Sequence, residues 1–191
     1  MFMKKPALIL LVLALQSAAN AQTWKVDKNN TRLGFTAVHL LISEVHGSFA
    51  KFDVKLTSTK EDFTDAQIEL SADVASINTN VEMRDNNLRS ASYLDAEKFP
   101  TMTFKSESLK KVEGKKYNLQ GILTLHGVSK PVTLDVIYNG AATSPANKLP
   151  VVGFKVIGTI KRTDFKIGEN AVGVSDDIQI EVDAEFFKMA N

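Results

Sequence analysis

A strict alternation of apolar and polar residues near the C-terminal end constrains the fold of this chain more than any other feature of its sequence. The apolar set consists of Ile178, Ile180, Val182, Ala184 and Phe186. The residues between them are polar or charged, namely Gln179, Glu181, Asp183 and Glu185. Successive side chains of a β-strand point to opposite faces of a sheet, so this segment is predicted to be a strand with one dry face and one wet face.

The same period of two returns along most of the chain. Further strands are predicted over residues 31–38, 47–56, 67–74, 101–105, 117–125, 132–138 and 152–160, which makes eight with the C-terminal one, and residues 24–26 extend the set. Phe49 and Phe52 stand three residues apart, which predicts a bulge. Strands at this density, joined by short turns, are typical of a sandwich or a closed barrel, and closure removes the unpaired edges along which sheets aggregate.

One segment, near residues 79–94, interrupts the alternation with densely charged sequence. Asn78 or Thr79 can cap a helix, Glu82 stands three residues after Thr79, and Met83 and Leu88 can form a buried stripe. We expect one short helix here. A charged insert of this kind in an all-β chain either decorates the outside of the sheet or closes one end of a barrel.

The first 21 residues resemble a secretory signal. They have a basic start at Lys4 and Lys5, an apolar run over residues 7–15, and a cleavage pattern at Ala19-Asn20-Ala21. The apolar run is about half as long as the roughly 20 residues that a membrane-spanning helix needs. We therefore expect residues 1–21 to be removed as a signal peptide, leaving residues 22–191 as a periplasmic or secreted domain without an integral membrane segment.

Composition excludes several classes of function. The chain has 23 basic and 22 acidic residues, so a bulk attraction to nucleic acid or to an anionic membrane is not expected. It contains no cysteine, which excludes disulfides, thiol chemistry and Cys-based metal sites. A mature chain of about 170 residues corresponds to one domain, whose core must come from packing alone.

Candidate catalytic chemistry is sparse. His39, His46 and His126 fall near predicted strand ends, but no HExxH motif supports a metal site, and polar loop tips explain them better. No Gly-x-Ser-x-Gly elbow and no glycine-rich phosphate loop is present. We therefore expect no catalytic residue, no metal and no cofactor.

Four charged residues remain open to two interpretations: Arg84, Asp85, Arg89 and Arg162. Arginine and aspartate at a barrel rim can form a network that fixes a lid, or an arginine can hold an anionic head group. We favour the structural interpretation for Arg84 and Arg162 and leave Arg89 open.

Aromatic residues are concentrated on or near the inward rows. They are Phe35, Phe49, Phe104, Tyr138, Phe154, Phe165 and Phe186. Such residues fill a core by default. An eight-stranded barrel, however, can either pack solid or hold one small ligand, and Gly121, Gly158 and Ala184 on the same rows leave room. A lipid-sized apolar cavity is therefore compatible with the sequence.

These motifs together resemble a known family. In order, the matching blocks are Trp24-x-x-Asp27 with Phe35 and His39, Ser43-x-Val45-x-Gly47-x-Phe49, Ser76-Ile77-x-Thr79, Arg84-Asp85-x-x-Leu88-Arg89-Ser90, Phe99-Pro100, Phe104-x-Ser106, Gly121-x-Leu123-Thr124-Leu125-His126-Gly127-Val128 with Lys130-Pro131-Val132, and Arg162-x-Asp164-Phe165. Through nearly the whole mature chain, they resemble the YceI-like family of exported polyisoprenoid-binding proteins.

The resemblance implies an all-β fold, an eight-stranded antiparallel lipocalin-like barrel with one short helix near one mouth. It also implies an apolar bore for an isoprenoid chain and no established enzyme activity. On this basis the expected bore residues are Phe35, Phe49, Phe104, Leu125, Phe154 and Phe165. The residues expected to order or guard the mouth are His39, Arg84, Asp85, Arg89 and Arg162.

The expected function is therefore the binding, storage or transport of a long-chain apolar ligand such as a polyisoprenoid or an isoprenoid quinone. A ligand-free structural or stress-response barrel is the alternative, and a metal-dependent periplasmic enzyme is a weaker one. We expect no nucleic-acid partner, and a homodimer remains open.

Overall fold

The computed structural model describes residues 21–169 and 171–189, so the expected signal peptide lies almost wholly outside the described residues. In chain order the elements are β1 (Gln22–Val26), β2 (Arg32–His39), β3 (Ser43–Phe49), β4 (Phe52–Ser58), β5 (Gln67–Asp73), a 3-10 turn (Val74–Ser76), β6 (Ile77–Asn78), α1 (Glu82–Arg89), β7 (Thr101–Glu113), β8 (Lys116–Leu125), β9 (Val128–Thr143), β10 (Pro150–Lys161), a second 3-10 turn (Arg162–Phe165) and β11 (Val174–Lys188).

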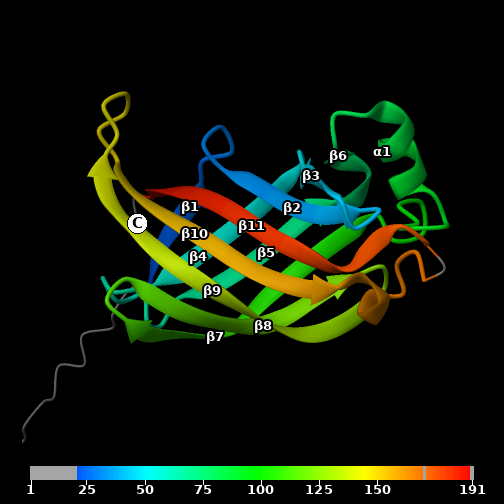
Figure 1. Cartoon of the computed structure of the whole chain (residues 1–191). Coiled ribbons are helices and arrows are strands. Elements are labelled where there is room, and N and C mark those ends of the chain that lie inside the picture. The colour runs from blue at the N-terminus through cyan, green and yellow to red at the C-terminus, as the bar shows by residue number, and fades with distance from the viewer. Residues whose placement is uncertain (1–20, 170, 190–191) are drawn as a thin grey trace, which may run out of the picture.

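Eight of these strands close into an antiparallel barrel (Figure 1), which confirms the predicted fold class. The order around the barrel is β1, β4, β5, β7, β8, β9, β10 and β11, and β11 pairs with β1 again. The closing seam is short, running from Trp24 opposite Lys188 to Val26 opposite Phe186. Because of this seam, neither β1 nor β11 is left as an open edge at that end of the barrel.

At the other end the sheet branches. There β11 pairs with β2, β2 pairs with β3, and β3 pairs with β6 through Ser48 opposite Asn78 and Phe49 opposite Ile77. The predicted bulge between Phe49 and Phe52 is an interruption at residues 50–51 that separates β3 from β4. The backbone N–H of Ala50 donates to the Ser76 carbonyl at 3.1 Å, so the interruption is tied to the 3-10 turn.

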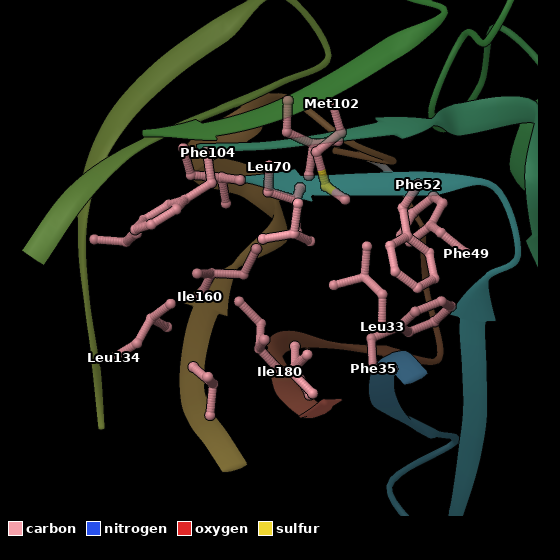
Figure 2. A pocket seen from close by; sticks show the side chains of 18 of the residues that line it. Leu33, Phe35, Phe49, Phe52, Leu70, Met102, Phe104, Leu134, Ile160 and Ile180 are labelled. Carbon is pink, nitrogen blue, oxygen red and sulfur yellow. The ribbon is translucent and has the colours of Figure 1, made fainter. Parts of the chain in front are cut away.

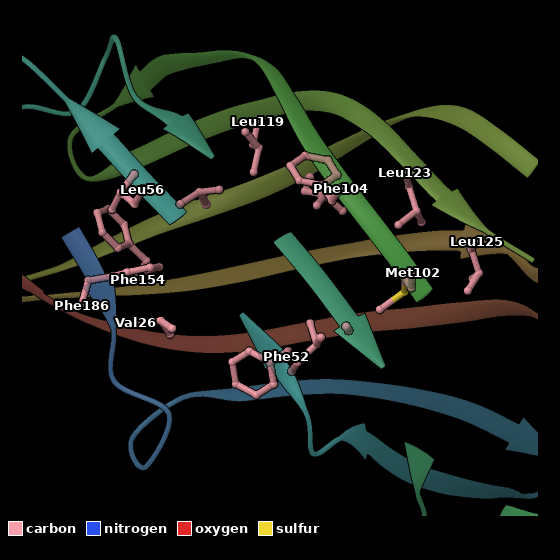
Figure 3. Close-up of a cluster of buried hydrophobic side chains, with 14 of the residues drawn as sticks. Val26, Phe52, Leu56, Met102, Phe104, Leu119, Leu123, Leu125, Phe154 and Phe186 are labelled. Carbon is pink, nitrogen blue, oxygen red and sulfur yellow. The ribbon is translucent and has the colours of Figure 1, made fainter. Parts of the chain in front are cut away.

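The alternation seen in the sequence sets the register of the walls. Val156 on β10 lies opposite Val136 on β9 and Val182 on β11, and all three belong to the apolar interior. Figure 3 shows the buried side chains of several strands converging, with Leu56, Phe154 and Phe186 toward one end and Met102 and Leu125 toward the other. The core is therefore the interior of the barrel itself.

An aromatic plug fills the end of the barrel opposite α1. Phe63, in the loop between β4 and β5, is buried against Trp24, Tyr138 and Phe154, with ring centroids 5.5, 5.8 and 5.2 Å away. Its φ of 58° is left-handed, a conformation that a phenylalanine rarely adopts. The loop is further held by the Tyr117 hydroxyl, which donates to the Asp62 carbonyl at 2.9 Å.

The predicted helix near residues 79–94 is confirmed as α1, but its expected buried stripe is wrong in part. Met83 is largely exposed, while Leu88 is half-buried and packs against the core. The buried residue of α1 is Asp85, whose carboxylate accepts from the Thr79 backbone N–H at 2.8 Å and from its hydroxyl at 2.6 Å. The N-cap position is held by Val81 without a side-chain bond, so Thr79 binds the helix through Asp85 instead of capping it.

Within the described residues, no helix combines the length and the apolar character that crossing a membrane requires. The α1 segment lies at the same end as the β2–β3 turn, the β8–β9 turn and the β10–β11 loop (Figure 1). This end is called the α1 end below, and the opposite one the Phe63 end.

Asp65 holds the loop between β4 and β5 that carries Phe63, through hydrogen bonds to its carboxylate. Partial burial raises the pKa of Asp65, but hydrogen bonds from Ser58, Thr59 and the backbone N–H groups of Thr59 and Lys60 outweigh it, so the pKa lies well below its usual value. The ionised carboxylate therefore stabilises the folded chain above the ordinary aspartate pKa near 3.9, and this stabilisation is lost as pH falls through the lowered value.

We predict that Asp65→Asn lowers the free energy of unfolding by about 1–2 kcal/mol at neutral pH, because the amide loses charge-assisted hydrogen bonds. Urea unfolding of both proteins measures the difference. It should shrink steadily below about pH 4, where the unfolded chain takes up the proton. A difference that stays constant across this range would contradict the assignment.

Candidate functional site

The barrel encloses an apolar cavity of about 260 Å³. Strands β2 to β5 and β7 to β11 all contribute to its wall. Figure 2 shows Phe35, Leu134 and Ile180 facing this common space from β2, β9 and β11. The polar side chains of the lining are those of Thr31, Tyr93 and Arg162. The other lining residues are aliphatic, aromatic, methionine or glycine. An interior of this kind can hold a hydrocarbon and offers little to a charged or strongly polar ligand.

Most of the expected bore residues line the cavity. Those in the wall are Phe35, Phe49, Phe104, Leu125 and Phe154. Phe165 is wrong as a lining residue, because its side chain is fully buried in the second 3-10 turn and does not contribute to the wall. It packs outside the bore because the turn that follows β10 leaves the strand alternation on which the expectation depended.

The expectation that Gly121 and Gly158 leave room in the bore is also wrong. A side chain at Gly121 would meet the ring of Phe104 at 2.5 Å and the carbonyl oxygen of Lys105. A side chain at Gly158 would meet the Cδ2 methyl of Leu134. The space beside these glycines is thus occupied by neighbouring side chains, which lie against the wall.

Arg162 lies at the α1 end of the wall, buried, with all five N–H groups directed at backbone carbonyls. Nε donates to Ser175 at 3.1 Å, Nη1 donates to Ile167 at 2.8 Å and to Gly168, and Nη2 donates to Ala171 at 3.2 Å and Val174 at 3.4 Å. The structural interpretation of Arg162 is the one that this geometry supports. A guanidinium has five such donors, so none is left over for a ligand head group.

Three of the four charged residues of α1 attach the helix to the preceding segment. Arg84 donates to the Thr79 hydroxyl at 2.8 Å and carbonyl at 3.0 Å. Arg89 donates to the carbonyls of Ala75 at 2.9 Å and Ile77 at 3.1 Å. Together with the Asp85 contacts to Thr79, these bonds hold α1 against the β5–β6 segment, and the contacts of Arg89 are of the kind that the structural interpretation expects.

A cover over the α1 end of the cavity follows from these attachments. Leu88, Tyr93 and Leu94 contribute to the lining. The Tyr93 ring lies against Gly168, where a side chain would meet it at 3.0 Å, and Gly168 has a left-handed φ of 53°. Because Arg162 binds the Gly168 carbonyl, it positions the loop against which Tyr93 rests.

The histidines are separated from one another. His39 is exposed at the end of β2, opposite Val174. His46 contacts the Thr36 hydroxyl at 2.8 Å, and His126 donates through Nδ1 to the Phe165 carbonyl at 3.0 Å. In the described part of the chain, no three His, Cys, Asp or Glu side chains gather closely enough to hold a metal ion.

Sequence reasoning missed the residues that close the two ends of the bore. Phe63 stands in a polar loop, and Tyr93 and Leu94 follow a helix without regular spacing. No periodic signal marks such residues. The available signal for Phe63 was a large apolar residue between Asp62 and Thr64 in a polar turn, which indicates burial by tertiary packing.

Comparison with known proteins places this barrel in a family. Residues 24–186 match the family model of the YceI-like domain. The protein YceI of Salmonella newport is 34% identical over 170 residues, which cover 88% of each chain.

Solved structures give the same result. The YceI protein of Campylobacter jejuni has a TM-score of 0.72 at 30% identity, covering 78% of this chain and 88% of its own. A polyisoprenoid binding domain from Saccharophagus degradans has a TM-score of 0.63 and covers 87% of this chain and 98% of its own. At 14% identity, this last likeness supports the fold alone.

The glycines of the wall predict a graded series of stabilities. Gly121→Ala should lower the free energy of unfolding by about 1–3 kcal/mol, because its new methyl group meets a backbone carbonyl that cannot move away. Gly158→Ala should cost less, since the Leu134 methyl can rotate. Gly153→Ala is the control, with its nearest neighbour at 3.6 Å. Urea unfolding ranks the three, and equal losses would contradict the packing described.

Proposed function

The chain belongs to the YceI-like domain family, and from this membership together with the apolar cavity we propose that the barrel binds one long-chain apolar ligand in its bore. The observation that carries the proposal is the wall, which is apolar from Phe63 at one end to Leu94 at the other. The contacts with the ligand would come from Phe35, Phe49, Phe104, Leu125 and Phe154 among other lining residues. Binding, storage or transport of lipid follows from this arrangement more directly than catalysis does.

A polyisoprenoid or an isoprenoid quinone is the proposed ligand class. Burial of about a dozen methylene-sized groups contributes on the order of 10 kcal/mol at roughly 0.8 kcal/mol each. Association itself costs about 4–15 kcal/mol, so a short chain binds marginally and a long one well. The name of the Saccharophagus degradans domain supports this class. Because the N–H groups of Arg162 are all engaged, selectivity should follow tail length more than head-group chemistry.

The α1 segment is the proposed gate. A cavity of about 260 Å³ is just below the range of roughly 300–1,000 Å³ that ligand pockets span. A long chain therefore requires the cover to move. The α1 end is attached mainly by hydrogen bonds that Arg84 and Arg89 donate and that Asp85 accepts. His39 lies at the same end, on the strand that borders it, and Arg162 keeps the facing loop in place.

The experiment that tests the proposal is lipid extraction. Purified protein should yield a long-chain isoprenoid in organic extracts analysed by mass spectrometry, or take one up after incubation with polyprenyl phosphates or quinones. Recovery of no lipid under both conditions would remove the carrier function and leave the ligand-free barrel.

Two adjacent substitutions make this test specific to the bore. Val156 lines the cavity, while its neighbour Ile157 points outward and is partly exposed. Val156→Phe should fill the bore and reduce retained lipid at least about tenfold, because the ring takes space and contact from the chain. Ile157→Phe adds the same ring outside and should retain lipid as the native protein does. Equal retention by both variants would place the ligand elsewhere.

Export is proposed from the signal-like N-terminus. The mature domain would then comprise residues 22–191 and work in the periplasm or outside the cell. Because the chain has no cysteine, its fold there would be stable without disulfides. We predict that N-terminal sequencing of protein expressed with residues 1–21 returns Gln22 as the first residue. A chain that retains Met1 in the soluble fraction would contradict this.

A further inference from the structure

Four large apolar side chains are exposed together at the α1 end. In the turn between β2 and β3, Leu40, Leu41 and Ile42 are 56%, 84% and 82% exposed. In the loop between β10 and β11, Val172 is 98% exposed. These four residues are called the tip patch below.

The two loops that carry the tip patch are joined to each other. The backbone N–H of Leu40 donates to the carbonyl of Gly173 at 2.6 Å. A side chain at Gly173, whose φ is 86°, would lie 2.7 Å from Cδ2 of Leu40. The tip patch is thus a single surface made by two loops in contact. The loop of Val172 is fixed from behind by Arg162, which binds the carbonyls of Ala171 and Val174.

The backbone of the turn makes its leucines hard to explain by folding alone. Leu40 and Leu41 have φ values of 51° and 61°, in the left-handed region. Glycine and asparagine adopt this conformation most easily, and both are also more soluble in a turn. Leucine at these positions therefore strains the backbone and exposes apolar surface to water. Both costs indicate that the side chains serve an interaction.

The tip patch continues directly from the cavity wall. Ala37 on β2 and Val174 on β11 line the cavity, and His39 lies opposite Val174 in the register between them. Leu40 follows Ala37 by three residues, and Val172 precedes Val174 by two. The tip patch therefore lies within a few residues of the bore wall on both loops.

We propose that the tip patch inserts into the surface of a lipid bilayer and holds the α1 end of the barrel against the membrane from which ligand enters. This inference rests on the proposed function, since a long isoprenoid is dissolved in the bilayer. The size of the patch favours a bilayer over a second copy of the chain. A standard protein interface uses roughly 20–30 residues a side, whereas protruding apolar tips can enter the headgroup boundary individually.

The charges near the tip patch are of both signs. Glu44 is exposed at the start of β3, and Glu169 and Lys166 are exposed on the β10–β11 loop. No cluster of lysine and arginine of the kind that recognises anionic lipid accompanies the patch in the described residues of these loops. The attachment should therefore be apolar, occurring on zwitterionic phosphatidylcholine and persisting at high salt.

A labelled cysteine tests insertion directly, because the chain has no cysteine of its own. Ile42→Cys carries an environment-sensitive fluorophore into the tip patch. Val112→Cys is the matched control, since Val112 is 69% exposed near the β7–β8 hairpin at the Phe63 end. With phosphatidylcholine vesicles, the label at position 42 should brighten and shift to the blue while that at position 112 should not. No change at 42, or the same change at both positions, would overturn the proposal.

Sedimentation with the same vesicles tests the side chains themselves. The double variant Leu41→Asn and Ile42→Asn should bind vesicles at least about tenfold less, because two large apolar groups no longer enter the bilayer. Asparagine suits the left-handed φ at position 41, so the fold should be retained. Val112→Asn should bind as the native protein does. Loss of binding in the control alone would contradict insertion of the tip patch. So would binding that falls with salt and is equally strong in the double variant and the native protein.

The two proposals fail in different ways. If extracts contain lipid but the label at position 42 does not respond, membrane insertion is wrong and ligand binding stands. If the label responds but Val156→Phe and native protein both yield no lipid, the bore function is wrong. A response of the label that grows with protein concentration without vesicles, with a doubled mass in sedimentation, would assign the tip patch to a second copy and overturn insertion.

Discussion

The short seam between β1 and β11 is the constraint on which the rest of the structure depends. Three residues on each strand pair across it, from Trp24 to Val26. Without this pairing the eight strands would form an open sheet whose apolar face and edges meet water. Closure turns that face into an enclosed bore, so the same alternation that builds each strand also builds the cavity.

The two ends of the bore are closed by different kinds of interaction. At the Phe63 end, four aromatic rings pack around one another, and the loop is held by an ionised Asp65. At the α1 end, the cover is attached through hydrogen bonds from Arg84 and Arg89 to backbone carbonyls. Aromatic packing excludes water and must be lost as a unit, whereas hydrogen bonds near the surface can be exchanged for water one at a time. The asymmetry supports the α1 end as the one that opens.

The sequence was sufficient for the walls and insufficient for the ends. Alternation predicted the strands and the inward row of β11, because a period of two has one structural meaning in a closed sheet. Five of the six residues that the family resemblance placed in the bore lie in the cavity lining. Alternation could not place Phe63 or Phe165, which lie in turns where no period holds. It also misjudged Gly121, because whether the space beside a glycine is open depends on the neighbouring strand, here on the Phe104 ring. Tertiary contacts between segments distant in sequence decide such positions.

Arg162 connects the bore to the surface. A buried guanidinium is costly unless its donors are satisfied, and here five backbone carbonyls satisfy them, three in the β10–β11 loop and two at the start of β11. Lysine has three donors on one atom and could not reach carbonyls spread along this loop, so the choice of arginine follows from geometry. The loop that it shapes supports Tyr93 over the bore on one side and presents Val172 to the outside on the other. A displacement of the loop at the membrane surface would therefore act on the cover of the cavity through Gly168.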